Sequence, residues 1–194
     1  MQYNDYDLVK DIVGGNTNAF RHIIRNHQKL VSHVVFRMIS HETDREEICQ
    51  EVFIRIFQNL KNFKFNSKLS TWIASIAYNE SVNYLKKQKM LFIDDRPNND
   101  DSPSPSEQIA SADDDIHVLL QKKNLKDTIQ NGLTELAPHY RTILTLYHMD
   151  ELSYEEIGEI TKLPDGTVKN YLFRARKQLK DILISKFKEE ELWA

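Results

Sequence analysis

The stretch from residue 91 to residue 115 constrains the fold most, because no helix or strand pattern continues through it. It holds three of the five prolines among runs of Asp, Asn and Ser, and its apolar residues recur at neither helical nor strand spacing. A structureless connection of this length is uncommon inside one compact domain. We therefore predict two modules, residues 1–90 and 116–194, joined by a flexible acidic linker; a surface insertion in a single domain is the alternative.

Both modules are predicted to be all-α, because their apolar residues recur at helical spacing and no alternating strand pattern is found. The segments with helical spacing are Leu8–Val13, Phe20–Ile39, Ile48–Leu60, Leu69–Leu85, Val118–Leu136, Tyr140–Tyr147, Tyr154–Ile160 and Val168–Ile184. The expected fold class is thus two small helical domains, of which the C-terminal one contains a helix-turn-helix.

The net charge of −3 is unevenly distributed along the chain. Residues 88–115 carry 2 Lys+Arg and 8 Asp+Glu, whereas residues 1–87 carry 12 and 9, so the acidity belongs mostly to the linker. The single cysteine, Cys49, excludes an intramolecular disulfide and a cysteine-based zinc cluster. No signal peptide or membrane-spanning run is found, so we expect a cytoplasmic protein that does not insert into membranes.

The helix-turn-helix is predicted from the sequence LSYEEIGEITKLPDGTVKNYLFRARKQLK, residues 152–180. Ser153 and Glu156 have the spacing of a capping box, which indicates a helix that begins at Tyr154. Gly158 would allow another helix to cross closely, and Pro164 suits the first position of the second helix.

The second helix is predicted to have a narrow apolar stripe, with Val168, Leu172, Ala175 and Leu179 facing inward. The opposite face is basic and carries an amide and an exposed ring: Gly166, Lys169, Asn170, Phe173, Arg174 and Lys177. Lys and Arg pair with guanine, Asn pairs with adenine, and a glycine at the helix N-terminus allows a phosphate to approach. We predict that this face recognises DNA in the major groove; a solvated basic helix is the alternative.

The helix expected from about Asp44 presents a polar patch opposite its apolar arc. The patch consists of Glu47, Gln50, Glu51 and Ile54. Neighbouring carboxylates beside an exposed isoleucine are typical of a surface for a basic, partly apolar partner. Acidic side chains near a helix N-terminus are also favoured by the helix dipole, and the pattern alone does not separate these interpretations.

Aromatic residues surround a polar loop in the segment that follows. Phe63, Phe65 and Trp72 flank Asn66-Ser67-Lys68, and the next helix carries a polar stripe of Ser75, Asn79, Asn83 and Lys86. Aromatic, amide and cationic side chains together suit single-stranded nucleic acid, because bases stack on rings and phosphates pair with cations. The alternative is that the aromatics belong to the core, which is where aromatics at helical spacing are usually found.

With these motifs together, the chain resembles the bacterial RNA polymerase sigma factors of the extracytoplasmic-function type. The resemblance is carried by EEICQEVFIRIF (46–57), NFKFNSKLSTWIASIAYN (62–79) and LSYEEIGEITKLPDGTVKNYLFRARKQL (152–179), and it covers almost the whole chain. It implies that residues 1–90 are region 2 and that residues 116–194 are region 4. The sequence departs from the family pattern at Ser75, where a basic residue is common, and at Glu47, where Asp is more usual.

The resemblance also implies roles for the motifs. Region 2 would bind a coiled coil on the polymerase largest subunit through Glu47, Gln50, Glu51 and Ile54, and would melt the −10 element and capture a flipped base in the loop beside Trp72. Region 4 would contact the polymerase flap. It would recognise the −35 element through the basic face of the second helix together with Tyr154, Thr167 and Arg176. The linker would follow the RNA-exit path. The implied partners are promoter DNA, core polymerase and an anti-sigma factor.

Three other classes of protein fit this sequence less well. A helix-turn-helix regulator that acts without being a polymerase subunit accounts for residues 152–180 but not for the motifs of residues 46–87. An enzyme is disfavoured because the seven histidines are scattered and HETDRE, from His41, lacks the second histidine of HExxH. No cofactor or metal is therefore expected. A protein-binding helical adaptor would show no salt-dependent DNA binding.

Overall fold

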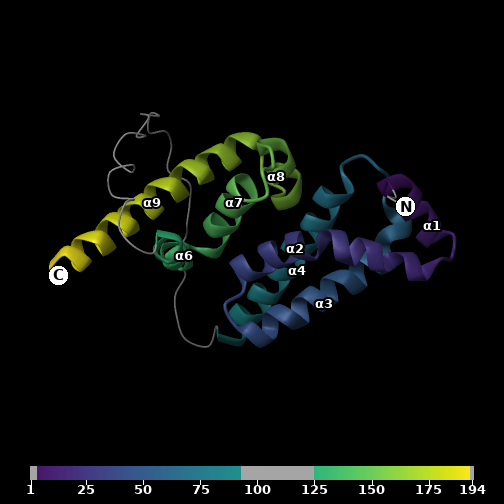
Figure 1. Ribbon diagram of the computed structural model, residues 1–194, viewed down its shortest axis with the longest axis horizontal. Helices are drawn as coiled ribbons and strands as arrows, with labels where there is room; N and C mark the ends of the chain where they lie inside the picture. Colours follow the sequence, from purple (N-terminus) through teal and green to yellow (C-terminus); the bar gives the residue numbers. More distant parts are fainter. Residues whose placement is uncertain (1–3, 93–124, 193–194) are drawn as a thin grey trace.

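The computed structural model describes residues 4–92 and 125–192, and the regular structure in these ranges is helical (Figure 1). This confirms the all-α prediction. Most of the predicted linker, and the part of the predicted Val118–Leu136 helix before residue 125, lie outside the described ranges. None of the described helices is long and apolar enough to cross a membrane.

Within residues 4–92 the chain forms four α-helices and two short 3-10 turns. In chain order they are α1 (Asp5–Val13), η1 (Thr17–Ala19), α2 (Phe20–Met38), α3 (Glu42–Asn59), η2 (Leu60–Asn62) and α4 (Leu69–Phe92). The side chain of Asn4 caps α1 by accepting a hydrogen bond from the backbone N–H of Asp7 at 2.8 Å. Helix α3 begins two residues before the predicted Asp44, and α4 extends two residues into the predicted linker.

The C-terminal half contains α6 (Leu125–Glu135), α7 (Pro138–His148), α8 (Tyr154–Thr161) and α9 (Asp165–Leu192). Pro138 is the first residue of α7, a position where the missing proline N–H costs nothing. The side chains of Ile143, Leu146 and Ile157 are fully buried between these helices. Their burial contributes about 1.5–3 kcal/mol each relative to exposed side chains.

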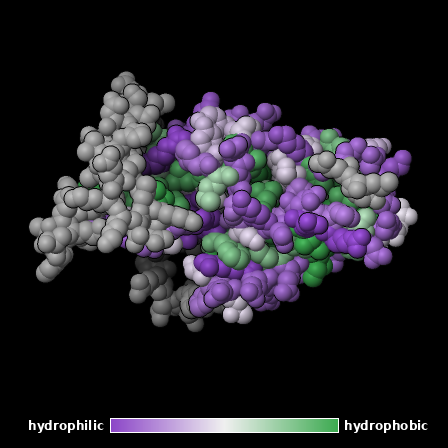
Figure 2. All heavy atoms as spheres, in the orientation of Figure 1, coloured by the Kyte–Doolittle hydropathy of each residue, from purple (hydrophilic) through white to green (hydrophobic). Residues whose placement is uncertain are grey.

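The two halves pack against each other through helices far apart in the sequence: α2 contacts α7, and α4 contacts α8 (Figure 1). Polar contacts connect them across this seam. His33 Nδ1 lies 2.9 Å from Asp150 Oδ1, and Arg37 donates to the side-chain oxygen of Gln130 at 2.8 Å. On the face drawn in Figure 2, hydrophilic side chains predominate and hydrophobic ones form separate patches.

Candidate nucleic-acid interface

Helix α8 begins with the capping box that the sequence predicts. The Ser153 hydroxyl accepts a hydrogen bond from the Glu156 N–H at 3.2 Å, and the Glu156 carboxylate accepts one from the Ser153 N–H at 2.9 Å. These two bonds satisfy two backbone donors that no helical carbonyl can reach. The start of α8 at Tyr154 is therefore confirmed.

The turn between α8 and α9 covers residues 162–164 and is one residue longer than predicted. Lys162 ends α8 with φ +61°, and a Cβ on Gly158 would lie 2.8 Å from the carbonyl oxygen of Leu163. The glycine thus makes room for the turn, and also for the Asp165 side chain at the start of α9, whose Oδ1 would lie 3.2 Å from that Cβ. Helix α9 begins at Asp165, and the carbonyl of Pro164 accepts a hydrogen bond from the Val168 N–H at 3.0 Å. Pro164 is therefore the residue before the first helical position, one place earlier than predicted.

One face of α9 anchors the helix in the C-terminal core. Val168, Leu172 and Ala175 are buried, and Leu179 packs against the same core, as the predicted apolar stripe requires. Because three and four residues make about one helical turn, this stripe directs the opposite face outward. The orientation of the DNA-facing side of α9 therefore follows from the apolar residues of the same helix.

The outward face of α9 carries the predicted cations and amide. Gly166, Lys169, Asn170 and Lys177 are exposed, whereas Thr167, Phe173 and Arg174 are half-buried. The expectation of a fully exposed Phe173 is therefore wrong, because part of its ring is covered in the folded chain. The face nevertheless presents donors for phosphates and base edges along its first three turns.

An aromatic pair beside α9 supports two of its cations. Tyr147 and Tyr154 stack with their ring centroids 5.2 Å apart, and the Arg176 guanidinium lies 5.2 Å from the Tyr147 ring centroid. Lys169 Nζ lies 5.6 Å from the Tyr154 ring centroid. The hydrogen bond from Tyr154 is the main cause that lowers the pKa of Tyr147, and Arg176 lowers it further. Each ring is thus close enough for a cation–π interaction, which helps to hold Lys169 and Arg176 in place on α9.

Tyr147 was not predicted as a site residue, nor was His148, whose ring nitrogen Nε2 lies 3.3 Å from Arg176 Nε. Burial is the main cause that lowers the pKa of His148, and Arg176 adds to it. Their place at the end of α7, just before a helix cap, is the signal that could have indicated them.

The aromatic residues of the N-terminal half divide between core and surface. Phe63 is buried, and its ring lies 5.1 Å from that of half-buried Trp72. Phe65 is 41% exposed at φ +58°, a backbone conformation that bulky residues rarely adopt. Its ring contacts Phe63 at 4.6 Å and Tyr6 at 5.1 Å. The core interpretation thus holds for Phe63, whereas Phe65 is held at the surface.

The polar loop after Phe65 contacts the C-terminal half. Asn66 is exposed and Ser67 half-buried, while Lys68 Nζ lies 2.8 Å from Glu156 Oε1. The hydrogen bond from Lys68 is the main cause that lowers the pKa of Glu156. The cation of the loop is therefore paired with the Glu156 carboxylate, which also belongs to the capping box of α8.

The polar stripe on α4 is only partly available. Asn79, Asn83 and Lys86 are exposed. Ser75 is half-buried, and its hydroxyl donates to the carbonyl of Trp72 at 2.7 Å, a bond within its own helix. Three of the four predicted positions thus face solvent, and the fourth has a local partner.

The acidic patch of α3 is a surface feature, as predicted. Glu47 and Gln50 are exposed and Ile54 is 50% exposed. Glu51 is half-buried and pairs with Arg55 at 3.2 Å, while Arg55 also pairs with Glu80 at 2.9 Å. The apolar part of the patch is extended by a residue that the sequence pattern did not indicate.

This missed residue is Phe57, which is 43% exposed on α3 and makes an edge-to-face contact with Phe20 at 5.1 Å. A helical-wheel comparison with Ile54 could have indicated it, because the two positions are three residues apart. Among the described residues, no three His, Cys, Asp or Glu side chains are grouped as a metal site requires.

Comparison with known proteins matches both halves of the chain. Residues 23–90 match the family described as Sigma-70 region 2, and residues 126–179 match Sigma-70, region 4. The chain is 34% identical over 182 residues to the ECF RNA polymerase sigma factor SigW of Bacillus subtilis, covering 90% of this chain and 96% of that protein. It is 30% identical over 192 residues to the ECF RNA polymerase sigma-E factor of Haemophilus influenzae, covering 93% and 95%.

Solved structures share the fold. The sigma factor RpoE of Bartonella quintana, in complex with the anti-sigma factor NepR, matches with a TM-score of 0.63 and 18% identity over 84% of this chain and 96% of that one. CnrH in complex with the cytosolic domain of CnrY matches with a TM-score of 0.62 and 17% identity over 93% and 97%. At these identities the likeness shows the arrangement of helices.

Proposed function

This chain belongs to the extracytoplasmic-function sigma factors of RNA polymerase, and from that premise we propose which of its residues carry each step of promoter recognition. As a sigma factor it directs the polymerase to promoters for the initiation of transcription. We assign residues 1–90 to region 2, 91–115 to the linker and 116–194 to region 4. The matched ranges, 23–90 and 126–179, support this division because they fall within it.

Helix α9 recognises the −35 element in this proposal. The observation that carries it is the exposed basic start of α9, fixed by a complete capping box on α8 and by a buried stripe on its own inner face. Lys169, Asn170 and Arg174 reach base edges, while Gly166, Thr167 and Lys177 contact the phosphate backbone. Tyr154 positions Lys169 through its ring, and Tyr147 does the same for Arg176.

The loop of residues 63–68 captures an unpaired base of the −10 element. Phe65 supports this role, because a half-exposed ring held at positive φ offers a stacking surface backed by Phe63. Removing a base from the duplex costs a few kcal/mol, which stacking and polar contacts must offset. Asn79, Asn83 and Lys86 continue the path for the single strand along α4.

The patch of Glu47, Gln50, Glu51 and Ile54 binds the polymerase core. An acidic rim around exposed Ile54 and Phe57 supports a partner that is basic and partly apolar, as an interface with a central anchor requires. We further propose that the protein works by binding, without catalysis of its own, and that it is located with its polymerase in the cytoplasm.

An anti-sigma factor is a further proposed partner. The similar sigma factor RpoE was solved with the anti-sigma factor NepR, which supports a partner of this class for the present chain. A regulator that acts without polymerase is not favoured, because it leaves the match to region 2 unexplained.

Engagement of the promoter requires the two halves to separate. Lys68 of the proposed −10 loop is paired with Glu156 of the helix-turn-helix, so this cation is unavailable to DNA while α4 packs on α8. Lys68 is exposed, and solvent screening weakens its ion pair, so binding of polymerase and DNA can replace it.

Run-off transcription tests the proposed function. The full chain is added to sigma-free core polymerase with a pool of genomic promoter fragments. We expect discrete transcripts from a small set of fragments that share two upstream elements. Transcript levels equal to those of core polymerase alone would contradict the assignment.

Replacement of Arg174 with alanine is expected to reduce discrimination for the −35 element. The change should cost about 1–3 kcal/mol against the matching sequence and little against a scrambled one, because a base-edge contact is lost. Competition binding of the holoenzyme to promoters with matched and scrambled −35 elements measures this difference.

The matched control is Lys180→Ala, which removes a cation from α9 six residues away, on another side of the helix. It should leave discrimination unchanged. Equal losses in both variants would mean that charge alone, and not the position of Arg174, accounts for the effect.

A further inference from the structure

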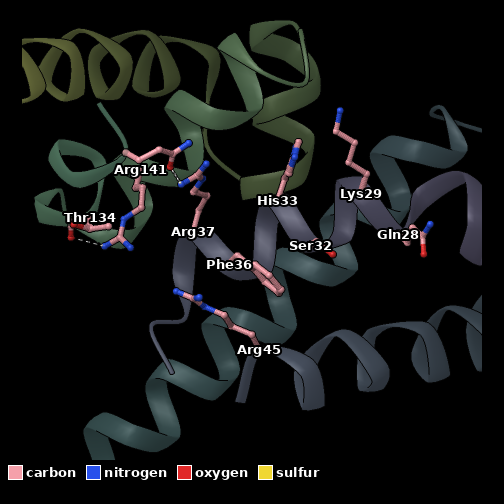
Figure 3. A pocket seen from close by; sticks show the side chains of 10 residues that line it. Gln28, Lys29, Ser32, His33, Phe36, Arg37, Arg45, Thr134 and Arg141 are labelled. Carbon is pink, nitrogen blue, oxygen red and sulfur yellow. Dashed lines mark hydrogen bonds between the residues drawn. The ribbon is translucent and has the colours of Figure 1, made fainter. Parts of the chain in front are cut away.

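A cleft of about 590 Å³ opens at the seam between the two halves and is lined by residues of α2, α3, α6 and α7 (Figure 3). Its walls come from both halves of the chain. Its cationic lining residues are Lys29, Arg37, Arg45 and Arg141. Its size is that of a small-molecule site, and much larger than a single phosphate ion needs.

The charge of this cleft is one-sided. Four of the ten lining residues are Lys or Arg, and none is Asp or Glu. Burial is the main cause that lowers the pKa of Arg141, and the neighbouring charges of Arg37 and Arg45 lower it further. The pKa of Arg37 is also lowered, by burial and then by Arg45, although Asp150 opposes this shift. The three guanidinium groups therefore repel one another.

Arg141 is the most deeply placed of these cations, with 7% of its surface exposed. Its Nη2 donates to the carbonyl oxygens of Thr134 at 3.1 Å and Leu136 at 3.0 Å. Its Nε has no hydrogen-bond partner among the described residues. A buried donor without a partner costs free energy, and the cost is larger on a charged group. Nε is itself shielded from solvent, so an anion in the cleft would act on the repulsion among these guanidinium groups and not on this donor.

The other two guanidinium groups are held along the same side of the cleft (Figure 3). Arg37 is oriented by its hydrogen bond to Gln130 at 2.8 Å. Arg45 donates from Nε to the carbonyl of Ile39 at 2.7 Å, and its guanidinium lies 5.2 Å from the Phe36 ring centroid. Each of these residues therefore has further N–H groups beyond those already bonded.

We propose that this cleft binds a compact polyphosphate anion through Arg37, Arg45 and Arg141. Guanidinium groups match the oxygens of phosphate with paired N–H donors, and several of them in one cleft favour an anion with more than one phosphate group. Free pyrophosphate and the phosphate chain of a nucleotide share this chemistry.

The anion would connect the halves of the molecule, since Arg37 and Arg45 belong to one half and Arg141 to the other. A ligand that binds the packed arrangement better than the separated one stabilises the packed arrangement. The bound anion would then weaken promoter binding, and bound promoter would weaken anion binding by the same factor. This consequence rests on the proposed function, whereas the binding of the anion does not.

Isothermal titration calorimetry of the full chain with sodium pyrophosphate tests the site, at constant ionic strength and with sodium sulfate as the reference. We expect saturable binding at one site, clearly tighter than that of sulfate. The double variant R37Q/R45Q should weaken it by roughly tenfold for each guanidinium removed. The variant R37K/R45K keeps the charges but loses the paired donors, so it should bind with intermediate affinity.

The matched control is K169Q/K177Q, which removes two cations from the exposed face of α9 and should leave pyrophosphate binding unchanged. Thermal melts establish whether each variant folds. If R37Q/R45Q does not fold, the affinity of R37K/R45K decides the test. A parallel titration with ATP distinguishes the source: equal affinity assigns recognition to the phosphates alone, and tighter binding assigns it to a nucleotide.

Three results would overturn the proposal. These are pyrophosphate binding no tighter than that of sulfate, an equal loss of binding in K169Q/K177Q, and tighter binding of an oligoglutamate peptide than of pyrophosphate. The first two deny a site at the seam, and the third assigns the cleft to an acidic protein segment. None of these measurements involves transcription, so they test the anion site independently of the proposed promoter function.

Discussion

A chain with Glu51→Arg is expected to lose most of its affinity for core polymerase and, with it, promoter-dependent transcription. The change places a second cation beside Arg55 in the middle of the acidic patch of α3. Repulsion against a basic partner surface should cost about 2–5 kcal/mol of binding free energy. Fluorescence anisotropy of the labelled chain titrated with core polymerase measures the loss.

The matched control is Glu46→Arg, the same charge reversal on an exposed residue of α3 outside the proposed patch. It should leave core binding within a factor of a few of the unaltered chain. The folded state should tolerate both changes, because the ion pair of Glu51 with Arg55 is partly exposed and worth at most about 1 kcal/mol. Similar losses in the two variants would contradict the assignment of Glu51 to the polymerase interface.

Gly158→Ala is expected to destabilise the helix-turn-helix by about 3 kcal/mol, at the upper end of the usual cost of overpacking. The added Cβ would lie 2.8 Å from the carbonyl oxygen of Leu163, a backbone atom that cannot move without shifting the start of α9. Chemical denaturation followed by circular dichroism measures the free energy of unfolding. DNA binding should be lost in parallel, because the turn sets the angle between α8 and α9.

The matched control for this change is Gly166→Ala, since a Cβ at Gly166 meets no atom within 4 Å. Alanine there should leave stability unchanged or raise it by about 0.5–1 kcal/mol, because glycine is the weaker helix former. Its effect should appear instead in DNA affinity, if the helix N-terminus approaches a phosphate as we propose. A larger loss of stability at residue 166 than at residue 158 would refute this interpretation of the turn.

The sequence predicted well those features that depend on residues close together in the chain. The capping box of Ser153 and Glu156 is one example, because both of its hydrogen bonds lie within four residues. The buried stripe of α9 is another, because helical periodicity alone determines which side chains share a face. The error at Pro164 is small, and it arose where one residue more or less changes the turn.

Exposure was harder to predict than secondary structure. Phe65 and Phe63 are two residues apart and equally apolar, yet the first is 41% exposed and the second 8%. Helical periodicity could not predict this difference in exposure, because the segment between η2 and α4 is not helical. The rings Tyr147 and Tyr154 pose the same problem, since they stack only because α7 and α8 end and begin at one place.

The sequence by itself therefore determined the helices, their caps, their inward faces and the family to which they belong. Only the tertiary structure decided which outward faces meet: Lys68 with Glu156, His33 with Asp150, and Arg141 with the arginines of the other half. The physical reason is that an apolar stripe specifies that a face must be buried, but not which partner buries it. Contacts between polar side chains of two halves follow from that packing, and no local pattern in the chain encodes them.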